Sequence, residues 1–175
     1  MKYTNSIFAL AILFTGCSVS DTDPPGIAVI DEAISESSIV DLSHGGLPLG
    51  IHIDQGITLE MDAKWNSAFG RMELTDGRDM SIFIVEDTLS VGTKKAEIEG
   101  GIFTISYLIE NDSLIFYKST LPDGSTPYWH FFASFQVGDS HYVFENNPLV
   151  ECTEGQIRAM TDLVERVRPL VNETQ

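Results

Sequence analysis

Apolar and polar positions alternate over most of the chain from residue 47 onwards, a period of two that is typical of half-buried β-strands. The alternation predicts strands at residues 47–53, 57–61, 68–74, 80–86, 114–119, 129–137 and 141–144. Residues 80–86 are largely apolar on both faces, so we expect a central strand that is covered on both sides. The Asp76-Gly77 dipeptide before it is a strong turn signal.

The last two strands are predicted to form a hairpin. Gly138-Asp139 fits a two-residue hairpin loop with Gly at its first central position. This loop would place Phe135 opposite Tyr142 and Ala133 opposite Phe144. Both pairs are apolar, so the loop chemistry and the hydrophobic pattern predict the same register.

Helical spacing appears in two places. Residues 90–98 predict a short helix that Gly100-Gly101 ends. Residues 102–110 favour its continuation after a kink, with a strand at 103–108 as the alternative.

The second helix is predicted near the C-terminus, where Thr153 and Gln156 form a capping box. The apolar stripe that follows predicts an amphipathic helix on the sheet, which Pro169 ends or bends. The stripe consists of Ile157, Met160, Leu163, Val164, Val167, Leu170 and Val171.

These elements predict the α+β class. We expect an antiparallel sheet of six to seven strands, with a short helical insert and a C-terminal helix on one of its faces. The expected organisation is a segment 1–16, an acidic tether 17–40 and a single domain 41–175. Residues 27–40 fit a short helix or a disordered extension equally well.

The first 17 residues predict export and lipidation. Lys2 precedes an apolar run at residues 7–14, which is far shorter than the roughly 20 residues of a spanning helix. The following Phe14-Thr15-Gly16-Cys17 resembles the lipobox of bacterial lipoproteins, although Phe14 stands where Leu is usual. The resemblance implies that the Cys17 thiol carries a diacylglycerol and that residues 1–16 are cleaved. The alternatives are an ordinary secretory signal with an incidental Cys, and an uncleaved apolar segment buried in a cytosolic protein.

The same resemblance implies a location. In lipoproteins of the common proteobacterial type, Asp after the lipidated Cys favours the inner membrane, and Ser18 occupies that place. We therefore expect a lipid-anchored protein of the bacterial cell envelope, at the outer membrane. The 26 acidic against 10 basic residues give a net charge of −16, which argues against nucleic-acid binding.

A broader resemblance covers residues 40–170. The run Asp41-Leu42-Ser43-His44-Gly45-Gly46-Leu47-Pro48, the strand His141-Tyr142-Val143-Phe144 and the helix at 153–168 resemble small bacterial lipoproteins with a PsbP-like or DcrB-like α+β sandwich. Those families are mostly accessory and binding proteins, and they supply no catalytic motif to this chain.

No residue pattern predicts a catalytic, metal or cofactor site. The expected register holds His130 and His141 about six residues apart, too far to share a metal. The strand histidines His52, His130 and His141 are expected to face solvent, and His44 lies in a Gly-Gly loop. Cys152 precedes a helix and lacks a base, which favours a buried structural thiol. Asp41, Ser43 and His44 are adjacent in sequence, whereas triads are assembled from separate segments. The acidic residues Asp54, Asp62, Asp76 and Asp79 lack the spacing of a calcium loop.

Aromatic residues predict a surface for a partner. Tyr128, Trp129 and Phe132 cluster at the start of one strand, and Phe132 falls among its polar positions. Phe132 therefore needs a cover, for which the terminal helix and another chain are the two alternatives, and helix cover is the favoured one. We predict a non-catalytic envelope lipoprotein that binds a protein or a small ligand. The alternatives are a divergent envelope hydrolase, and an immunity or inhibitor-type protein for a basic partner.

Overall fold

The computed structural model describes residues 38–53 and 61–170. Its strands are β1 (Ser38–Asp41), β2 (Leu49–Ile53), β3 (Asp62–Asn66), β4 (Arg71–Thr75), β5 (Ser81–Glu86), β6 (Thr104–Glu110), β7 (Leu114–Thr120), β8 (Tyr128–Val137), β9 (Ser140–Asn146) and β10 (Val167–Pro169). Its helices are α1 (Val91–Glu99) and α2 (Glu154–Val164), with a 3-10 turn, η1, at Ser43–Gly45. The predicted α+β class is confirmed.

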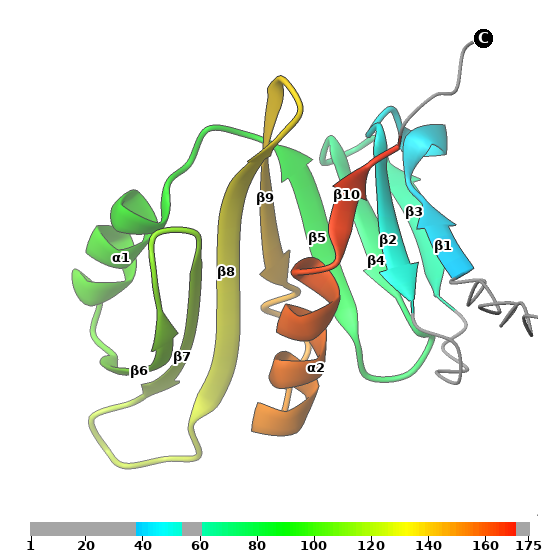
Figure 1. The fold of residues 1–175 in the computed structure, drawn as a ribbon. Helices are drawn as coiled ribbons and strands as arrows, with labels where there is room; N and C mark the ends of the chain where they lie inside the picture. The colour runs from blue at the N-terminus through cyan, green and yellow to red at the C-terminus, as the bar shows by residue number, and fades with distance from the viewer. Residues whose placement is uncertain (1–37, 54–60, 171–175) are drawn as a thin grey trace, which may run out of the picture. The chain divides into compact units, whose positions relative to one another are not determined.

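Seven strands form one antiparallel sheet in the order β3-β4-β5-β9-β8-β7-β6 (Figure 1). A second antiparallel sheet has the order β1-β2-β10. As predicted, β5 is internal and buries Ile82, Phe83 and Ile84. The Arg71 guanidinium lies 3.4 Å from the centre of the Phe83 ring and covers it.

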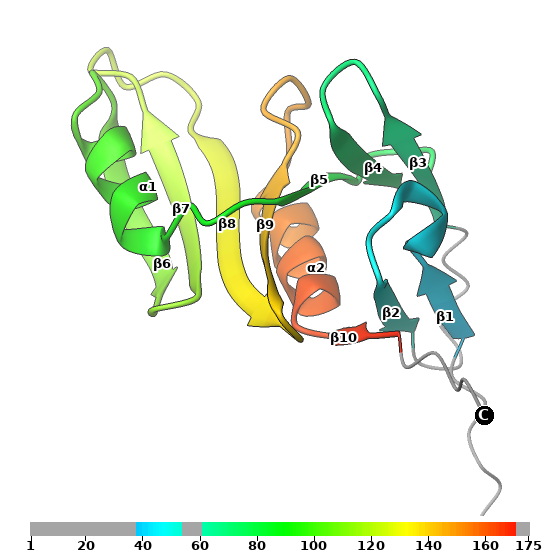
Figure 2. The same cartoon turned by 90° about the horizontal axis from the view of Figure 1, so that it is seen from above.

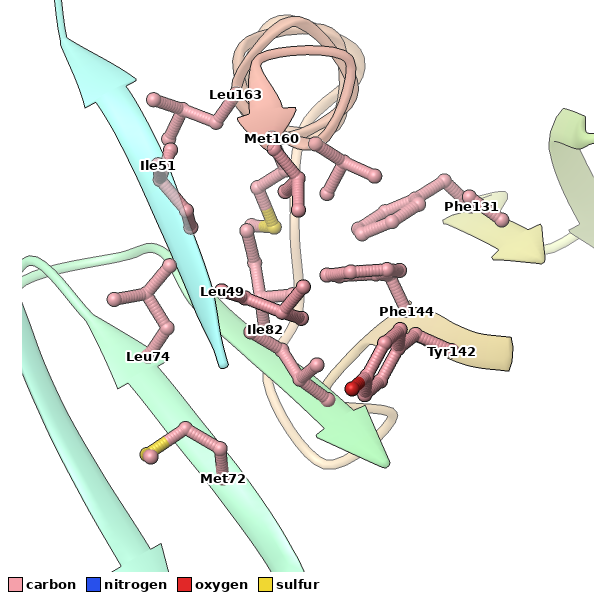
Figure 3. Close-up of a cluster of buried hydrophobic side chains, with 14 of the residues drawn as sticks. Leu49, Ile51, Met72, Leu74, Ile82, Phe131, Tyr142, Phe144, Met160 and Leu163 are labelled. Atoms are coloured by element: carbon pink, nitrogen blue, oxygen red, sulfur yellow. The ribbon is translucent and has the colours of Figure 1, made fainter. Parts of the chain in front are cut away.

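The main core lies between the large sheet and a layer made of α2 and the small sheet (Figure 2). Apolar side chains from all three interdigitate there, which removes their surface from water. Figure 3 shows examples from β2 (Leu49, Ile51), α2 (Met160, Leu163), β5 (Ile82), β8 (Phe131) and β9 (Tyr142, Phe144).

The other face of the large sheet carries α1. Val91 of α1 packs with Ile115, Phe132 and Val143 in a second, smaller cluster. Successive strand residues point to opposite faces, so Phe131 joins the α2 core while Phe132 lies under α1. The expectation that both helices share one face is therefore wrong. Phe132 does have a helical cover, but α1 supplies it instead of the terminal helix.

The predicted hairpin is confirmed in its register. Phe135 pairs with Tyr142 and Ala133 with Phe144, and Gln136 stands opposite His141. Gly138 adopts a φ of +64°, a left-handed conformation that glycine reaches without strain.

Two stretches for which a helix was favoured are strands, and at residues 102–110 the structure shows the alternative, a strand at 103–108, with bounds 104–110. Residues 104–110 form β6, because Gly100 ends α1 and the following residues alternate in exposure along the sheet edge. The terminal helix ends at Val164, and Val167 pairs with Ile51 as part of β10, so the helix predicted through 168 is too long. Leu170 follows β10 outside any helix, and Val171 lies outside the described residues.

The predicted capping box at the start of α2 is confirmed, since the Thr153 and Gln156 side chains each accept a hydrogen bond from the other residue's main-chain N–H.

In the N-terminal half of the chain, several observed strand boundaries differ from the predicted ones. β3 was not predicted, because its residues are mostly polar and it lies at the sheet edge. The strand predicted at 68–74 begins only at Arg71. The strand predicted at 57–61 lies outside the described residues except for Met61, which is in no strand. Residues 38–40, which the sequence assigns to the tether, open β1. Residues 1–16, for which export is predicted, Cys17 and the rest of the predicted tether lie outside the described residues.

Candidate functional site

Strand β8 extends beyond its neighbour β9. It pairs with β7 over residues 128–133, but its pairing with β9 begins only at Phe132. The side chain of Asn146 closes the end of that ladder, where its Oδ1 accepts a hydrogen bond of 2.9 Å from the Phe131 N–H. Residues 128–130, here called the β8 start, therefore have a strand partner on one side only.

Two cavities meet at the β8 start. The face cavity, of about 380 Å³, lies on the α1 side of the sheet. The edge cavity, of about 770 Å³, lies between the chain before β8 and the segment that joins β9 to α2. Tyr128, His130 and Pro148 line both cavities. Both volumes fall in the range of about 300–1,000 Å³ that is typical of ligand pockets.

The wall of the face cavity is mostly apolar. Helix α1 ends before it covers this part of the sheet, which leaves Phe103 and Tyr128 39% and 41% exposed. The apolar lining consists of Ile98, Phe103, Ile105, Tyr117, Tyr128 and Pro148. A few polar groups in an apolar pocket fix the orientation of a ligand, so the polar lining is of interest.

His130 and Ser119 provide the central polar pair of this cavity. Ser119 Oγ and His130 Nε2 lie 3.1 Å apart, and the Tyr117 ring lies 5.1 Å from the imidazole. Burial, and then the positive charge of Lys94, lower the pKa of His130. The imidazole is thus neutral at pH 7, and no described residue forms a hydrogen bond with its Nδ1. The expectation that His130 faces solvent is wrong, because the sheet face around it is partly covered.

The edge cavity is bounded by two segments without regular structure. Trp129 packs on Phe116 beside it, with 5.9 Å between the ring centres. The buried Ser125 Oγ has no hydrogen-bond partner among the described residues, and Leu149 is 91% exposed. Of the described residues that line either cavity, the charged ones are Glu97 and Glu151, and none is Lys or Arg.

Another cavity, of about 410 Å³, lies at the opposite end of β8. Its polar groups already bond within the chain: Asn111 accepts from the Ser113 and Leu114 N–H groups, and Gln136 donates to the Gly138 carbonyl. Arg168 donates to main-chain carbonyls. These polar groups stabilise the local turns. This cavity therefore offers a ligand fewer available hydrogen-bonding groups than the β8 start does.

Two of the remaining histidine side chains, those of His44 and His141, bond to main chain. His44 Nε2 lies 2.6 Å from the Ala63 carbonyl oxygen, and His141 Nδ1 lies 2.9 Å from that of Asp87. His52 lies half-buried on β2. Within residues 38–53 and 61–170, no three His, Cys, Asp or Glu side chains gather as a metal site requires.

The other polar candidates also have local roles. Asp41 Oδ1 accepts a hydrogen bond from the Ser43 N–H, which lowers the pKa of Asp41 and shapes η1. Asp76 Oδ1 accepts from the Arg78 and Met80 N–H groups in the turn before β5.

Two further candidates, Cys152 and Asp62, have little chemistry of their own here. Burial, followed by the charge of Asp79, raises the pKa of the Cys152 thiol, which disfavours the reactive thiolate. Asp62 lies exposed on β3, and Asp54 lies outside the described residues.

The sequence predicts part of this site. Tyr128 and Trp129 belong to the predicted partner surface, whereas Ser119 is not among the predicted residues. The available signal is the strand register, since Ser119 lies two positions from Tyr117, the partner of His130 in the β7–β8 pairing.

No protein-family model matches this chain, and comparison with curated proteins and with solved structures gives no match either. The resemblances to lipoproteins and to PsbP-like or DcrB-like domains therefore stay predictions. In the described part of the chain, neither helix has the length and apolar character needed to cross a membrane.

Proposed function

We propose that this chain is a non-catalytic, lipid-anchored protein of the bacterial cell envelope that binds a partner at the β8 start. The observation that carries the proposal is the meeting of two open cavities at Tyr128, His130 and Pro148. Large apolar side chains at its rim, Phe103 and Leu149, are exposed as well. Contiguous exposed apolar surface beside a pocket is characteristic of interaction sites.

The lipobox supports the proposed location. Acylation at Cys17 would hold the domain at a membrane, and the sequence after Cys17 favours the outer membrane. Several acyl chains anchor a protein far more firmly than one, because each buried CH₂ contributes about 0.8 kcal/mol.

A divergent hydrolase is the second candidate, and the Ser119–His130 pair is the observation in its favour. A serine nucleophile needs a base within hydrogen-bond reach, a group that orients this base, and donors for the oxyanion. The described residues place no carboxylate on His130 Nδ1, and Ser119 belongs to a strand paired on both sides. Binding therefore requires fewer additional features than catalysis. Turnover of a p-nitrophenyl ester that Ser119→Ala abolishes would reverse this preference.

The binding proposal is tested by comparing two exposed aromatics. Envelopes from cells carrying the unaltered protein, Tyr128→Ala or Phe69→Ala are crosslinked, and the captured proteins are quantified. Phe69 is the matched control, because it is 69% exposed and lies outside both cavities. We expect a partner that is lost with Tyr128→Ala and kept with Phe69→Ala. Equal capture by both variants would contradict the proposal.

A further inference from the structure

The main chain of β8 has an unused edge at Trp129. Residues along a strand direct their N–H and C=O groups alternately to the two sides. The Ser134 N–H donates to Ser113, on the β7 side, whereas the Phe131 N–H turns to the β9 side. Trp129, two residues before Phe131, therefore directs its N–H and C=O to the β9 side as well. Strand β9 does not reach this position, so these two groups have no strand partner among the described residues.

The space beside this edge is open. The edge cavity, of about 770 Å³, is lined by Trp129 and lies where a further strand would run, about 4.7–4.9 Å from β8. A strand added there would direct alternate side chains to the α1 face, where the face cavity begins between Tyr128 and His130. Exposed strand edges of this kind are templates for pairing with another chain.

The charges indicate which chain would pair. The charged side chains lining the two cavities, Glu97 and Glu151, are both acidic. Glu97 Oε2 lies 3.9 Å from Lys94 Nζ, which leaves Glu151 as the lining carboxylate without an ion pair among the described residues. A second copy of this chain would bring its own net charge of −16 and be repelled. A segment with Lys or Arg among its residues matches this surface.

We propose that the β8 start binds an extended, cationic segment of a partner protein by β-strand addition at Trp129. This inference rests on the proposed function and specifies its partner. The main-chain groups of Trp129 supply affinity, and the face cavity and the Glu151 carboxylate select side chains.

The test uses the full chain, purified in mild detergent, with Trp65→Phe. The chain has two tryptophans, so emission then reports on Trp129 alone. Three capped seven-residue peptides are titrated: one of alternating Lys and Val, the same peptide N-methylated at alternate amides, and one with Glu in place of Lys. N-methylation removes main-chain donors and leaves the side chains unchanged.

We expect the Lys/Val peptide to shift the Trp129 emission and the N-methylated peptide to bind about two- to tenfold more weakly, as the loss of the hydrogen bond from a peptide N–H to the Trp129 carbonyl predicts. Glu151→Lys should weaken binding of the Lys/Val peptide by about two- to fivefold. Asp112→Lys is the matched control, since it makes the same charge change in the turn before β7, outside both cavities. It should leave binding unchanged.

Equal binding of the N-methylated peptide would overturn strand addition, and equal binding of the Glu peptide would overturn the cationic partner. An emission shift that follows protein concentration without peptide would make a second copy the occupant and overturn the inference. Absence of binding by all three peptides would overturn it as well. The proposed function is judged separately, by the loss of a captured partner in Tyr128→Ala.

Discussion

The hydroxyl group of Tyr142 gives a direct test of the core. Tyr142 lies on β9 within the cluster of Figure 3, is 0% exposed, and its Oη has no hydrogen-bond partner among the described residues. An unsatisfied buried hydroxyl costs about 1–3 kcal/mol of desolvation free energy. Tyr142→Phe removes this oxygen and keeps the ring. We expect the free energy of unfolding to rise by about 1–2 kcal/mol, which raises Tm by roughly 3–10 °C for a domain of this size.

Urea unfolding followed by circular dichroism measures this change, with Tyr107→Phe as the matched control. Tyr107 Oη donates a hydrogen bond of 2.9 Å to Glu99, so the same substitution there removes a made bond. We expect Tyr107→Phe to lower the free energy of unfolding by up to about 1 kcal/mol. The two substitutions should thus have opposite signs. A loss of stability in Tyr142→Phe would refute the reasoning, because it would mean that the hydroxyl is satisfied in the core.

Three further predictions concern the anchor, the terminal helix and pH. Cys17→Ser should abolish acylation and release the protein from the membrane fraction; an intact mass of the unaltered mature protein without acyl chains would contradict the lipoprotein prediction. A chain that ends at Val150 lacks the buried apolar side chains of α2, each of which contributes about 1.5–3 kcal/mol to folding. Its circular dichroism spectrum should therefore be that of an unfolded chain, and a folded, soluble product would count against helix-on-sheet packing. Because the pKa of folded His130 is lowered, its contribution to stability is complete above the unfolded pKa near 6.5 and is lost as pH falls through the folded pKa. His130→Gln should therefore lose less stability than the unaltered protein below pH 6.5, and equal losses in urea titrations would exclude this role.

Local sequence patterns were sufficient to predict part of the fold. The two-residue loop at Gly138 fixes the register of β8 and β9, because a shift by one residue would turn every apolar side chain to the wrong face. The capping box at Thr153 likewise marks the start of α2 with two hydrogen bonds between neighbouring residues. In both places, residues close in sequence make the decisive contacts.

Other features depend on residues far apart in sequence. Residues 167–169 form the strand β10 because Val167 pairs with Ile51 in the small sheet, although the sequence of β10 continues the apolar stripe of helix α2. Phe132 lies under α1 because α1 packs on the face opposite to α2, which no local pattern specifies. Tertiary pairing overrides local preference at these positions.

The candidate site has the same origin. Its aromatic residues were visible in the sequence, because Tyr128 and Trp129 stand together at the start of a strand. Its chemistry was not visible in the sequence. The unpaired main-chain edge at Trp129 exists only because β9 ends at Asn146 while β8 and β7 continue to pair. The Ser119–His130 contact requires the β7–β8 register as well. A difference in length between neighbouring strands thus creates both the cavity and the main-chain groups that a partner can bind, and it is measurable only once the strands are paired.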